Sequence, residues 1–292
     1  MAVFFEKLNR AYELSKACYR IVFYHKHLIW FPLLSSISCV LILISMGFWV
    51  FTTPFFDQIV HEIKSRSLQD HQAEFYTLTF IFYLVNYFVI FFFNSALMAC
   101  TLRILNGQEA SVSFGISMAT KRITQIFAWA LVSATIGLVL KVISDKSNLI
   151  GKIISALLGG AWTVLSYFVV PYIIVQGASP WSAFSKSSKL IYQKWGDALR
   201  AEFSFLILSG AAMFCWFIFL SFCAFFFAQT HPILLAVMGI TGFIVIHLIT
   251  STAEGIFRGV LFNYATGREL PIGLQMYTED FQNHFQSKRL ED

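Results

Sequence analysis

The sequence predicts an all-α membrane protein with six transmembrane helices and additional amphipathic helices at the cytoplasmic membrane interface. The 292 residues are 57% hydrophobic and only 13% charged, whereas soluble domains carry about 25% charged residues. A soluble fold of this size could not cover its surface with so few charges. Several apolar runs also reach the roughly 20 residues that a helix needs to cross a bilayer. We therefore treat residues 1–292 as a single polytopic membrane domain.

The first expected element is an amphipathic helix over residues 3–24. Its aromatic and aliphatic side chains recur every three or four positions, and its charged side chains fall on the opposite face. This pattern is typical of a helix that lies in the membrane interface, although a helix packed on a protein surface has the same pattern. The segment lacks the apolar core and the small-residue cleavage site of a signal peptide.

Six apolar runs follow the amphipathic helix. They predict spans over residues 28–51, 75–105, 123–143, 149–175, 203–228 and 233–252. The fourth run contains Gly159, Gly160 and Pro171, which predict a kinked and closely packed helix. Residues 263–292 are expected to form a cytoplasmic tail.

The positions of the basic residues predict the orientation. If the N-terminus is cytoplasmic, the residues that fall outside are Lys64, Arg66, Lys141, Lys146 and Lys152, and the other Lys and Arg among the 21 fall inside. The positive-inside rule then places both termini in the cytoplasm. The three lysines of the short outer loop between the third and fourth spans are a local exception to this rule.

The cytoplasmic segments before the third and fifth spans share a pattern. Each begins with a glycine, Gly107 or Gly177, and continues through a short polar turn to Phe114 or Phe184, then a serine and basic residues. With the N-terminal helix as a candidate third copy, the unit is an interfacial helix followed by a transmembrane hairpin, repeated three times. Independent convergence on the same interfacial chemistry would give a similar pattern. In the second copy we expect residues 179–195 to lie along the inner membrane surface.

Four stretches resemble a known family. They are "LIWFPLLSSI" near the first span, "FFFNSALMA" in the second, "AWTVLSYFVVPYIIVQGASPWSAFSKSSKLIYQKWG" from Ala161, and "IFRGVLFNYATGRELPIG" after the sixth. The chain resembles the bacterial and archaeal six-helix integral membrane proteins that are grouped as a domain of unknown function. It departs from that pattern at Gln176, where the resemblance leads us to expect an acidic residue. The resemblance implies a multi-pass protein of the bacterial plasma (inner) membrane, and it supplies no activity and no catalytic residues.

The sequence contains no enzyme signature. It has no GxSxG, Walker loop, HExxH motif or pair of carboxylates in an apolar setting, and His247 is the one candidate base inside a span. The five cysteines show neither CxxC nor Cys/His ligand spacing, so no disulfide framework or zinc site is indicated. We expect no catalytic residue, no cofactor and no metal. The net charge of +5 lies in loops and reflects topology, not nucleic-acid binding.

Polar residues inside or beside the spans are the candidate functional residues. They are Asn86, Asn94, His247, Ser251, Glu254 and Arg258. The two asparagines share one face of the second span, and Asn94 in particular is expected to hydrogen-bond to another span. The other four share one face of the sixth span, with His247 turned into the protein. Glu254 and Arg258, spaced i,i+4, form either an interfacial ion pair or part of a polar stripe that lines a cavity or a subunit contact.

Two kinds of function fit these features better than an intramembrane enzyme, which has only His247 in its support. The first is a non-catalytic membrane-organising or scaffold protein that binds membrane lipids, because the cytoplasmic helices combine Phe and Lys with Trp181 and Trp195. The alternative is a channel or transporter with a polar path near spans two and six, although the bilayer centre holds few ionisable groups. Whether the protein forms a homo-oligomer stays open.

Overall fold

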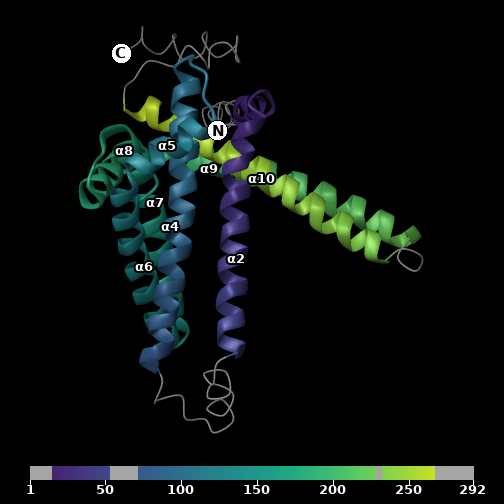
Figure 1. Ribbon diagram of the computed structural model, residues 1–292, viewed down its shortest axis with the longest axis horizontal. Coiled ribbons are helices and arrows are strands. Elements are labelled where there is room, and N and C mark those ends of the chain that lie inside the picture. The colour runs from purple at the N-terminus through teal and green to yellow at the C-terminus, as the bar shows by residue number, and fades with distance from the viewer. Residues whose placement is uncertain (1–14, 53–71, 228–231, 267–292) are drawn as a thin grey trace. The chain divides into compact units, whose positions relative to one another are not determined.

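The computed structural model describes residues 15–52, 72–227 and 232–266, and all regular structure within these ranges is helical (Figure 1). The chain forms two compact units. Unit 1 contains the residues up to Pro32, Leu97–Gly115 and the chain from Leu190 onward, and unit 2 contains Leu33–Ala96 and Ile116–Lys189. The predicted helix over residues 3–24 and the predicted tail lie largely outside the described residues.

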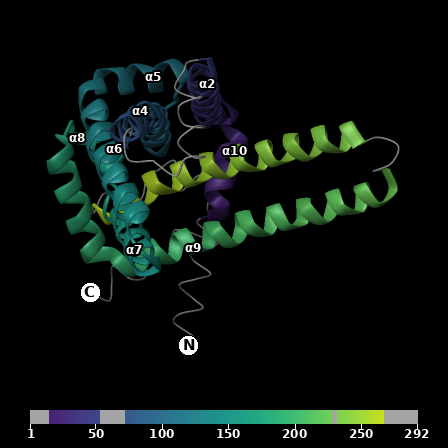
Figure 2. The same ribbon diagram turned by 90° about the horizontal axis from the view of Figure 1, so that it is seen from below.

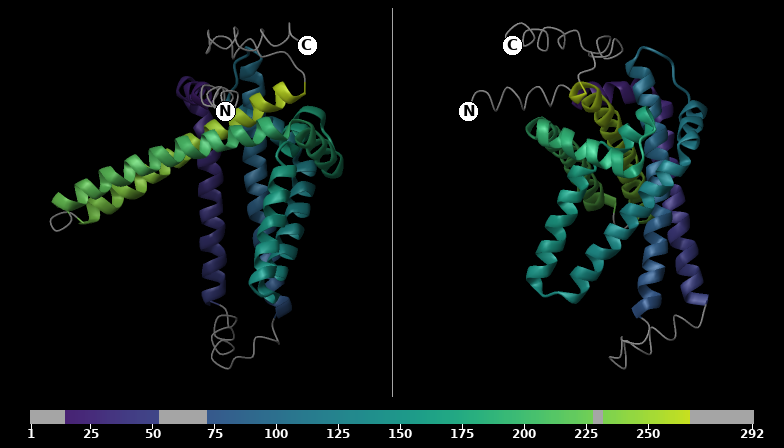
Figure 3. Two further views of the ribbon diagram at one scale, coloured as in Figure 1. Left: turned by 180° about the vertical axis from the view of Figure 1, so that it is seen from behind. Right: turned by 90° about the vertical axis from the view of Figure 1, so that its left-hand side faces the viewer.

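The described part of unit 2 contains seven helices or helix segments. They are α2 (Trp30–Thr52) after its first turn, α4 (Gln72–Leu105) as far as Ala96, most of α5 (Val112–Lys121), α6 (Ile123–Lys146), α7 (Leu149–Leu165), α8 (Val169–Gln176) and the start of α9 (Pro180–Phe227). α6 and α7 form a hairpin (Figure 3), and Ser155 of α7 donates a hydrogen bond of 2.8 Å to the Leu140 carbonyl of α6. α4 approaches α6 closely, because a Cβ built on Gly137 would lie 3.3 Å from the Tyr83 ring.

Unit 1 contains the helical residues 15–24, η1 (Lys26–Ile29), the last turns of α4, the rest of α9 and α10 (Pro232–Ala265). α9 and α10 run side by side as an antiparallel pair (Figures 1 and 2). Gly242 of α10 leaves room for the Trp216 ring of α9, which a Cβ at that position would overlap. The core of the unit includes Ile21, Leu28 and Phe257, all of which are fully buried.

The multi-pass character of the chain is confirmed. Within the described residues, five helices are long and apolar enough to cross a membrane: Lys26–Thr52, Ala73–Leu105, Ile123–Lys146, Leu149–Gln176 and Pro232–Ala265. The first four agree with the first four predicted spans to within a few residues. The predicted fifth span lies in α9, whose described apolar stretch Gly210–Ala224 is shorter than a membrane crossing. The crossing predicted over residues 203–228, and with it the count of six spans, therefore stays a prediction.

α10 extends beyond residue 252, where the sixth span is predicted to end. α10 continues to Ala265 because apolar residues beyond the predicted end, including Ile256, Phe257 and Val260, are buried inside unit 1. The sequence places Glu254 and Arg258 among these residues and so suggests a water boundary, but their apolar neighbours pack on protein. The first residues of the predicted tail, 263–265, also belong to α10.

The segment over residues 179–195 is not a separate interfacial helix. From Pro180 onward it is the beginning of the 48-residue helix α9, and no helix end separates it from the predicted fifth span. In this part of α9, Leu190 and Ile191 are buried whereas Lys186 and Lys189 are exposed. In the N-terminal segment, residues 15–24 bury one face that includes Cys18 in unit 1.

Candidate functional site

The fourth predicted span is broken close to its end. α7 ends at Leu165, residues 166–168 form a turn, and α8 begins at Val169. Pro171 in the first turn of α8 explains the break, because proline has no N–H and its ring excludes the carbonyl four residues earlier from a regular helix. The kink predicted from Pro171 is thus a full interruption. Such an interruption leaves backbone N–H and C=O groups that need partners where water is scarce.

Ser187 of α9 supplies these partners. Its fully buried hydroxyl donates a hydrogen bond to the Leu165 carbonyl at 2.7 Å and accepts one from the Phe168 N–H at 3.0 Å. One side chain therefore bridges both sides of the break. The bridge also means that these two backbone groups are not available to an ion or a substrate. In the sequence, Ser187 is recognisable only as the serine that follows Phe184 in the repeated pattern, because nothing there connects it with Leu165.

Stacked aromatic rings hold the start of α9 against the α6–α7 hairpin. Phe184 stacks on Trp162 of α7 with 4.8 Å between ring centroids, and Trp162 stacks on Trp129 of α6 at 5.4 Å. Phe184 also stacks on the ring of Trp181, at 5.9 Å. Trp181 is 74% exposed, so the stack leads from the packed interior to the surface beside the first turn of α9.

An arginine occupies the space beside the glycine that ends α8. Gly177 has a φ of +61° and caps α8 in the left-handed conformation. A Cβ on Gly177 would lie 2.5 Å from Nη1 and 2.8 Å from Cζ of Arg122. Arg122 directly precedes α6 and Gly177 directly follows α8, so the guanidinium lies at the shared end of two candidate spans. Arg122 is half-buried, and its Nε is buried with no hydrogen-bond partner among the described residues.

A lysine approaches the same end of α8. The exposed Lys186 donates a hydrogen bond of 2.7 Å from Nζ to Oε1 of Gln176, and its Nζ lies 5.9 Å from the centre of the Tyr172 ring. Because Gln176 is neutral, it fixes the ammonium group without cancelling its charge.

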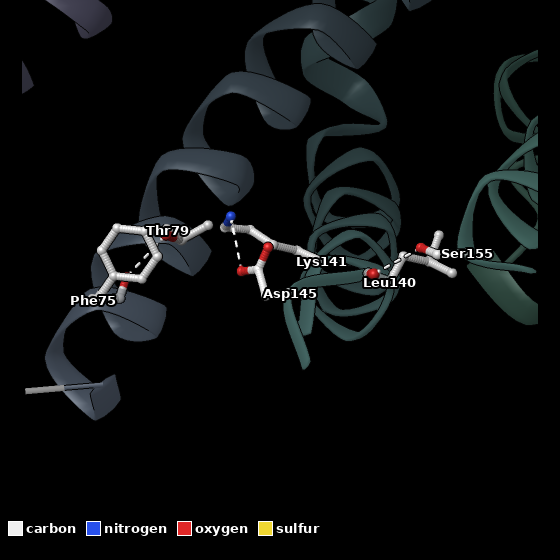
Figure 4. Close-up of polar contacts among 6 residues, drawn as sticks. All are labelled: Phe75, Thr79, Leu140, Lys141, Asp145 and Ser155. Carbon is white, nitrogen blue, oxygen red and sulfur yellow. Dashed lines mark hydrogen bonds and ion pairs between the residues drawn. The ribbon is translucent and has the colours of Figure 1, made fainter. Parts of the chain in front are cut away.

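The opposite end of α6 has a different charge balance. There, Lys141 pairs with Asp145 at 3.1 Å and also lies over the Phe75 ring at 5.4 Å (Figure 4). Asp145 is the one acidic residue within 116–189. The end of α8 is consequently basic without a neutralising carboxylate from this segment. Lys141 is one of the three lysines that the predicted topology places in an outer loop, and its pairing with Asp145 neutralises one of their charges.

The predicted polar residues of the second span belong to unit 2. Asn86 is half-buried, and its Nδ2 donates to the Phe82 carbonyl of its own helix at 2.8 Å. Asn94 is also half-buried, and the hydrogen bond expected between Asn94 and another span is not found within the described residues.

The four predicted residues of the sixth span lie on α10 in unit 1. His247 is exposed on this chain instead of turned inward, and its ring stacks on Phe243 at 6.4 Å. Ser251, Glu254 and Arg258 are half-buried, and both charged residues take part in interactions. Burial raises the pKa of Tyr19, and the charge of Glu254 raises it further, whereas the hydrogen bond from the Tyr19 hydroxyl to Thr250 lowers it.

Two glycines on α10 were missed as structural determinants. A Cβ on Gly255 would overlap the side chain of Leu97, and one on Gly259 would lie 2.8 Å from Cγ2 of Thr101. α10 therefore packs on the last turns of α4 through a Gly-x-x-x-Gly face, a pattern that allows helices to approach closely. The motif is visible in the sequence, among the charged residues Glu254 and Arg258 that drew attention to this stretch.

Comparison with known proteins agrees with the resemblance noted in the sequence. A model described as a family of unknown function (DUF6159) matches residues 73–270. The matched range contains nearly all of α4 and all of α5 to α10, and therefore includes the broken fourth span together with Ser187, Arg122 and Lys186. It excludes the first span, which contains the "LIWFPLLSSI" stretch. No curated protein and no solved structure matches the chain significantly. Because the match covers most of the sequence, the chain belongs to the family of unknown function DUF6159.

Proposed function

We propose that this protein is a non-catalytic integral membrane protein that binds anionic phospholipids at its cytoplasmic surface and helps to organise the inner face of the bacterial plasma membrane. The observation that carries the proposal is a group of basic residues at one end of unit 2, here called the basic end. These residues are Lys121, Arg122, Lys186 and Lys189. The three lysines are exposed. Asp145, the one acidic residue within 116–189, lies at the opposite end of α6.

The basic end has the position and charge that binding to an anionic leaflet requires. α6 begins directly after Arg122 and the fourth candidate span ends directly before Gly177, so the charges fall where lipid headgroups meet the spans. A basic residue near an anionic surface contributes about 1 kcal/mol of attraction, and four of them contribute roughly 4 kcal/mol. The exposed ring of Trp181 suits the same level, because tryptophan is enriched at the membrane–water interface.

The proposal includes six spans with both termini in the cytoplasm. The excess of Lys and Arg in the inner segments supports this topology, as does the Lys141–Asp145 ion pair, which reduces the positive charge of one outer loop. Cysteine labelling tests it. We expect a cysteine at Lys189 to react only with reagent that has access to the cytoplasm, and one at Lys152 to react from the outside. The reverse pattern would contradict the topology and the lipid-binding surface together.

Lipid retention tests the function itself. The full chain is purified from vesicles of equal parts phosphatidylglycerol and phosphatidylethanolamine, and the retained lipids are quantified by mass spectrometry. We expect enrichment of phosphatidylglycerol, and a loss of this enrichment when Lys121, Lys186 and Lys189 are all replaced by Gln. Replacement of Lys141, Lys146 and Lys152 by Gln is the matched control, since it removes the same charge from the opposite end of the helices. An equal effect of the two triple variants would refute the proposal.

A further inference from the structure

We infer that Arg122 is a phosphate ligand, and that the guanidinium beside Gly177 together with Lys186 forms a defined site for one phosphate group of an anionic lipid. The inference rests on the proposed function, but it replaces a diffuse charged surface by a site with a fixed ligand and stoichiometry. Three features of unit 2 support it: the unpartnered donors of Arg122, the shape of Gly177, and the neutral partner of Lys186.

The first feature is the set of hydrogen-bond donors on Arg122. A guanidinium carries five N–H donors and a permanent charge, yet the side chain of Arg122 has no hydrogen-bond or ion-pair partner among the described residues. Its Nε is shielded from solvent as well. A half-buried charged group without an acceptor is unfavourable, and a phosphate matches the planar fork of the guanidinium with two parallel hydrogen bonds. No hydrogen bond joins the guanidinium to the last carbonyls of α8, although Gly177 directly follows them.

The second feature is a difference between two glycines that share one backbone conformation. Gly107 has a φ of +74° and Gly177 a φ of +61°, so a side chain would strain the backbone at either position. A Cβ on Gly107 would meet no atom within 4 Å, whereas a Cβ on Gly177 would collide with the Arg122 guanidinium. Gly177 therefore has two roles. It adopts the positive φ that ends α8, and its lack of a side chain leaves space for the Arg122 guanidinium.

The third feature is the way in which Lys186 is held. Its hydrogen bond to Oε1 of Gln176 and its position over the Tyr172 ring place the ammonium group at the end of α8. A carboxylate at position 176 would form an ion pair with Lys186 and repel an incoming anion. The amide keeps Lys186 in place and leaves its full charge to attract a second phosphate oxygen.

The setting points to a lipid phosphate as the source of the anion. Arg122 is the last residue before the apolar helix α6, and the exposed Trp181 ring belongs to the first turn of α9, which begins three residues after Gly177. An anion at this level sits directly above the ends of two membrane spans. A headgroup phosphate is anchored at that level by its own acyl chains, whereas free phosphate would have to be concentrated there from water.

The inference is tested by measuring lipid binding to the full chain in detergent with native mass spectrometry and short-chain phosphatidylglycerol. We expect one tightly retained lipid per chain. Arg122→Gln should weaken its binding about tenfold or more, as expected for the loss of a bidentate charge-assisted pair, and Arg122→Lys should restore only part of it. Lys152→Gln, which removes an exposed charge outside the basic end, should change the affinity by less than about threefold.

Two further variants keep the test decisive if Arg122→Gln fails to fold. Gly177→Ala should weaken lipid binding, whereas Gly107→Ala, with a comparable backbone strain, should not. Gln176→Glu replaces an exposed amide and should weaken binding several-fold without unfolding the protein. Equal lipid binding by the wild type, Arg122→Gln and Gln176→Glu would overturn the inference.

The outcomes separate the site from the broader proposal. If Arg122→Gln and Gln176→Glu bind like the wild type while the triple lysine variant loses its enrichment in phosphatidylglycerol, the site inference fails and the proposed function stands. If neither kind of variant changes lipid retention, both fail. A separate arm adds inorganic phosphate alone. Competition by free phosphate at concentrations near those of the lipid would show that the site selects the free anion, and it would overturn the assignment to lipid.

Discussion

Replacement of Ser187 by alanine should destabilise the protein more than a single buried serine normally would. The substitution removes one hydroxyl and nearly conserves volume, so the expected loss comes from hydrogen bonding. It strands two backbone groups at once, the Leu165 carbonyl and the Phe168 N–H, which lie 2.7 Å and 3.0 Å from the hydroxyl. Each buried group left without a partner costs about 1–3 kcal/mol. Allowing for partial relaxation of the turn, we expect a loss of about 2–4 kcal/mol.

The measurement is reversible unfolding of the full chain in mixed micelles, followed by helical circular dichroism. Ser188→Ala is the matched control, because Ser188 is the next residue and its hydroxyl bonds only to the Ser185 carbonyl of its own helix. Its replacement should change the free energy of unfolding by less than about 0.5 kcal/mol. Ordinary hydrogen bonds between membrane helices contribute about 0.6 kcal/mol on average. A loss for Ser187→Ala at or below that value would refute the idea that the serine supports the break.

Three other predictions concern packing, a surface pair and pH. In thermal unfolding, Gly255→Ala should destabilise unit 1 by about 1–3 kcal/mol, because the new Cβ overlaps Leu97. The control Gly210→Ala places a Cβ that meets no atom within 4 Å, and it should be neutral or stabilising by up to about 1 kcal/mol. Lys141→Gln should lower the free energy of unfolding by no more than about 1 kcal/mol, because its pair with Asp145 is 28% and 40% exposed; a larger loss in chemical unfolding would contradict this view of the pair. The pKa of His25 is lowered, mainly by burial and to a smaller extent by the charge of His27, whereas the charge of Glu109 acts in the opposite direction. The folded state thus favours neutral His25, so its contribution to stability is present above the unfolded pKa of about 6.5 and is lost as the pH falls. Melting temperatures at pH 8 and pH 5 should therefore differ less in His25→Gln than in the wild type, and an unchanged difference would contradict the assignment.

Hydropathy predicted the first four spans well, because the length of an apolar run reflects the thickness of the layer that it crosses. It did not indicate that α10 continues past residue 252, since apolar side chains such as Ile256 and Phe257 look the same in the sequence whether lipid or protein surrounds them. The structure shows that protein surrounds them. A single sequence has no signal that distinguishes the two environments when charged residues such as Glu254 interrupt the run.

The basic end could be predicted only in part. Its lysines were visible as an excess of positive charge, and Gly107 and Gly177 were visible as matched positions of a repeat, in agreement with their shared positive φ. The roles of Arg122 and Ser187 were not visible, because each depends on a contact with a residue far away in the sequence, Gly177 or Leu165. Only the folded arrangement of α6, α8 and α9 brings these pairs together.

The bridge by Ser187 also orders the events of biosynthesis. The ribosome completes the broken fourth span before it adds Ser187, which lies later in the chain, in α9. During that interval Pro171 already prevents a continuous helix, while the carbonyl of Leu165 and the N–H of Phe168 have not yet met their partner. These groups must then bond to water or to the insertion machinery. The fourth span can reach its final form in lipid only after the start of α9 has been synthesised and has docked, so membrane integration of this segment depends on chain that follows it.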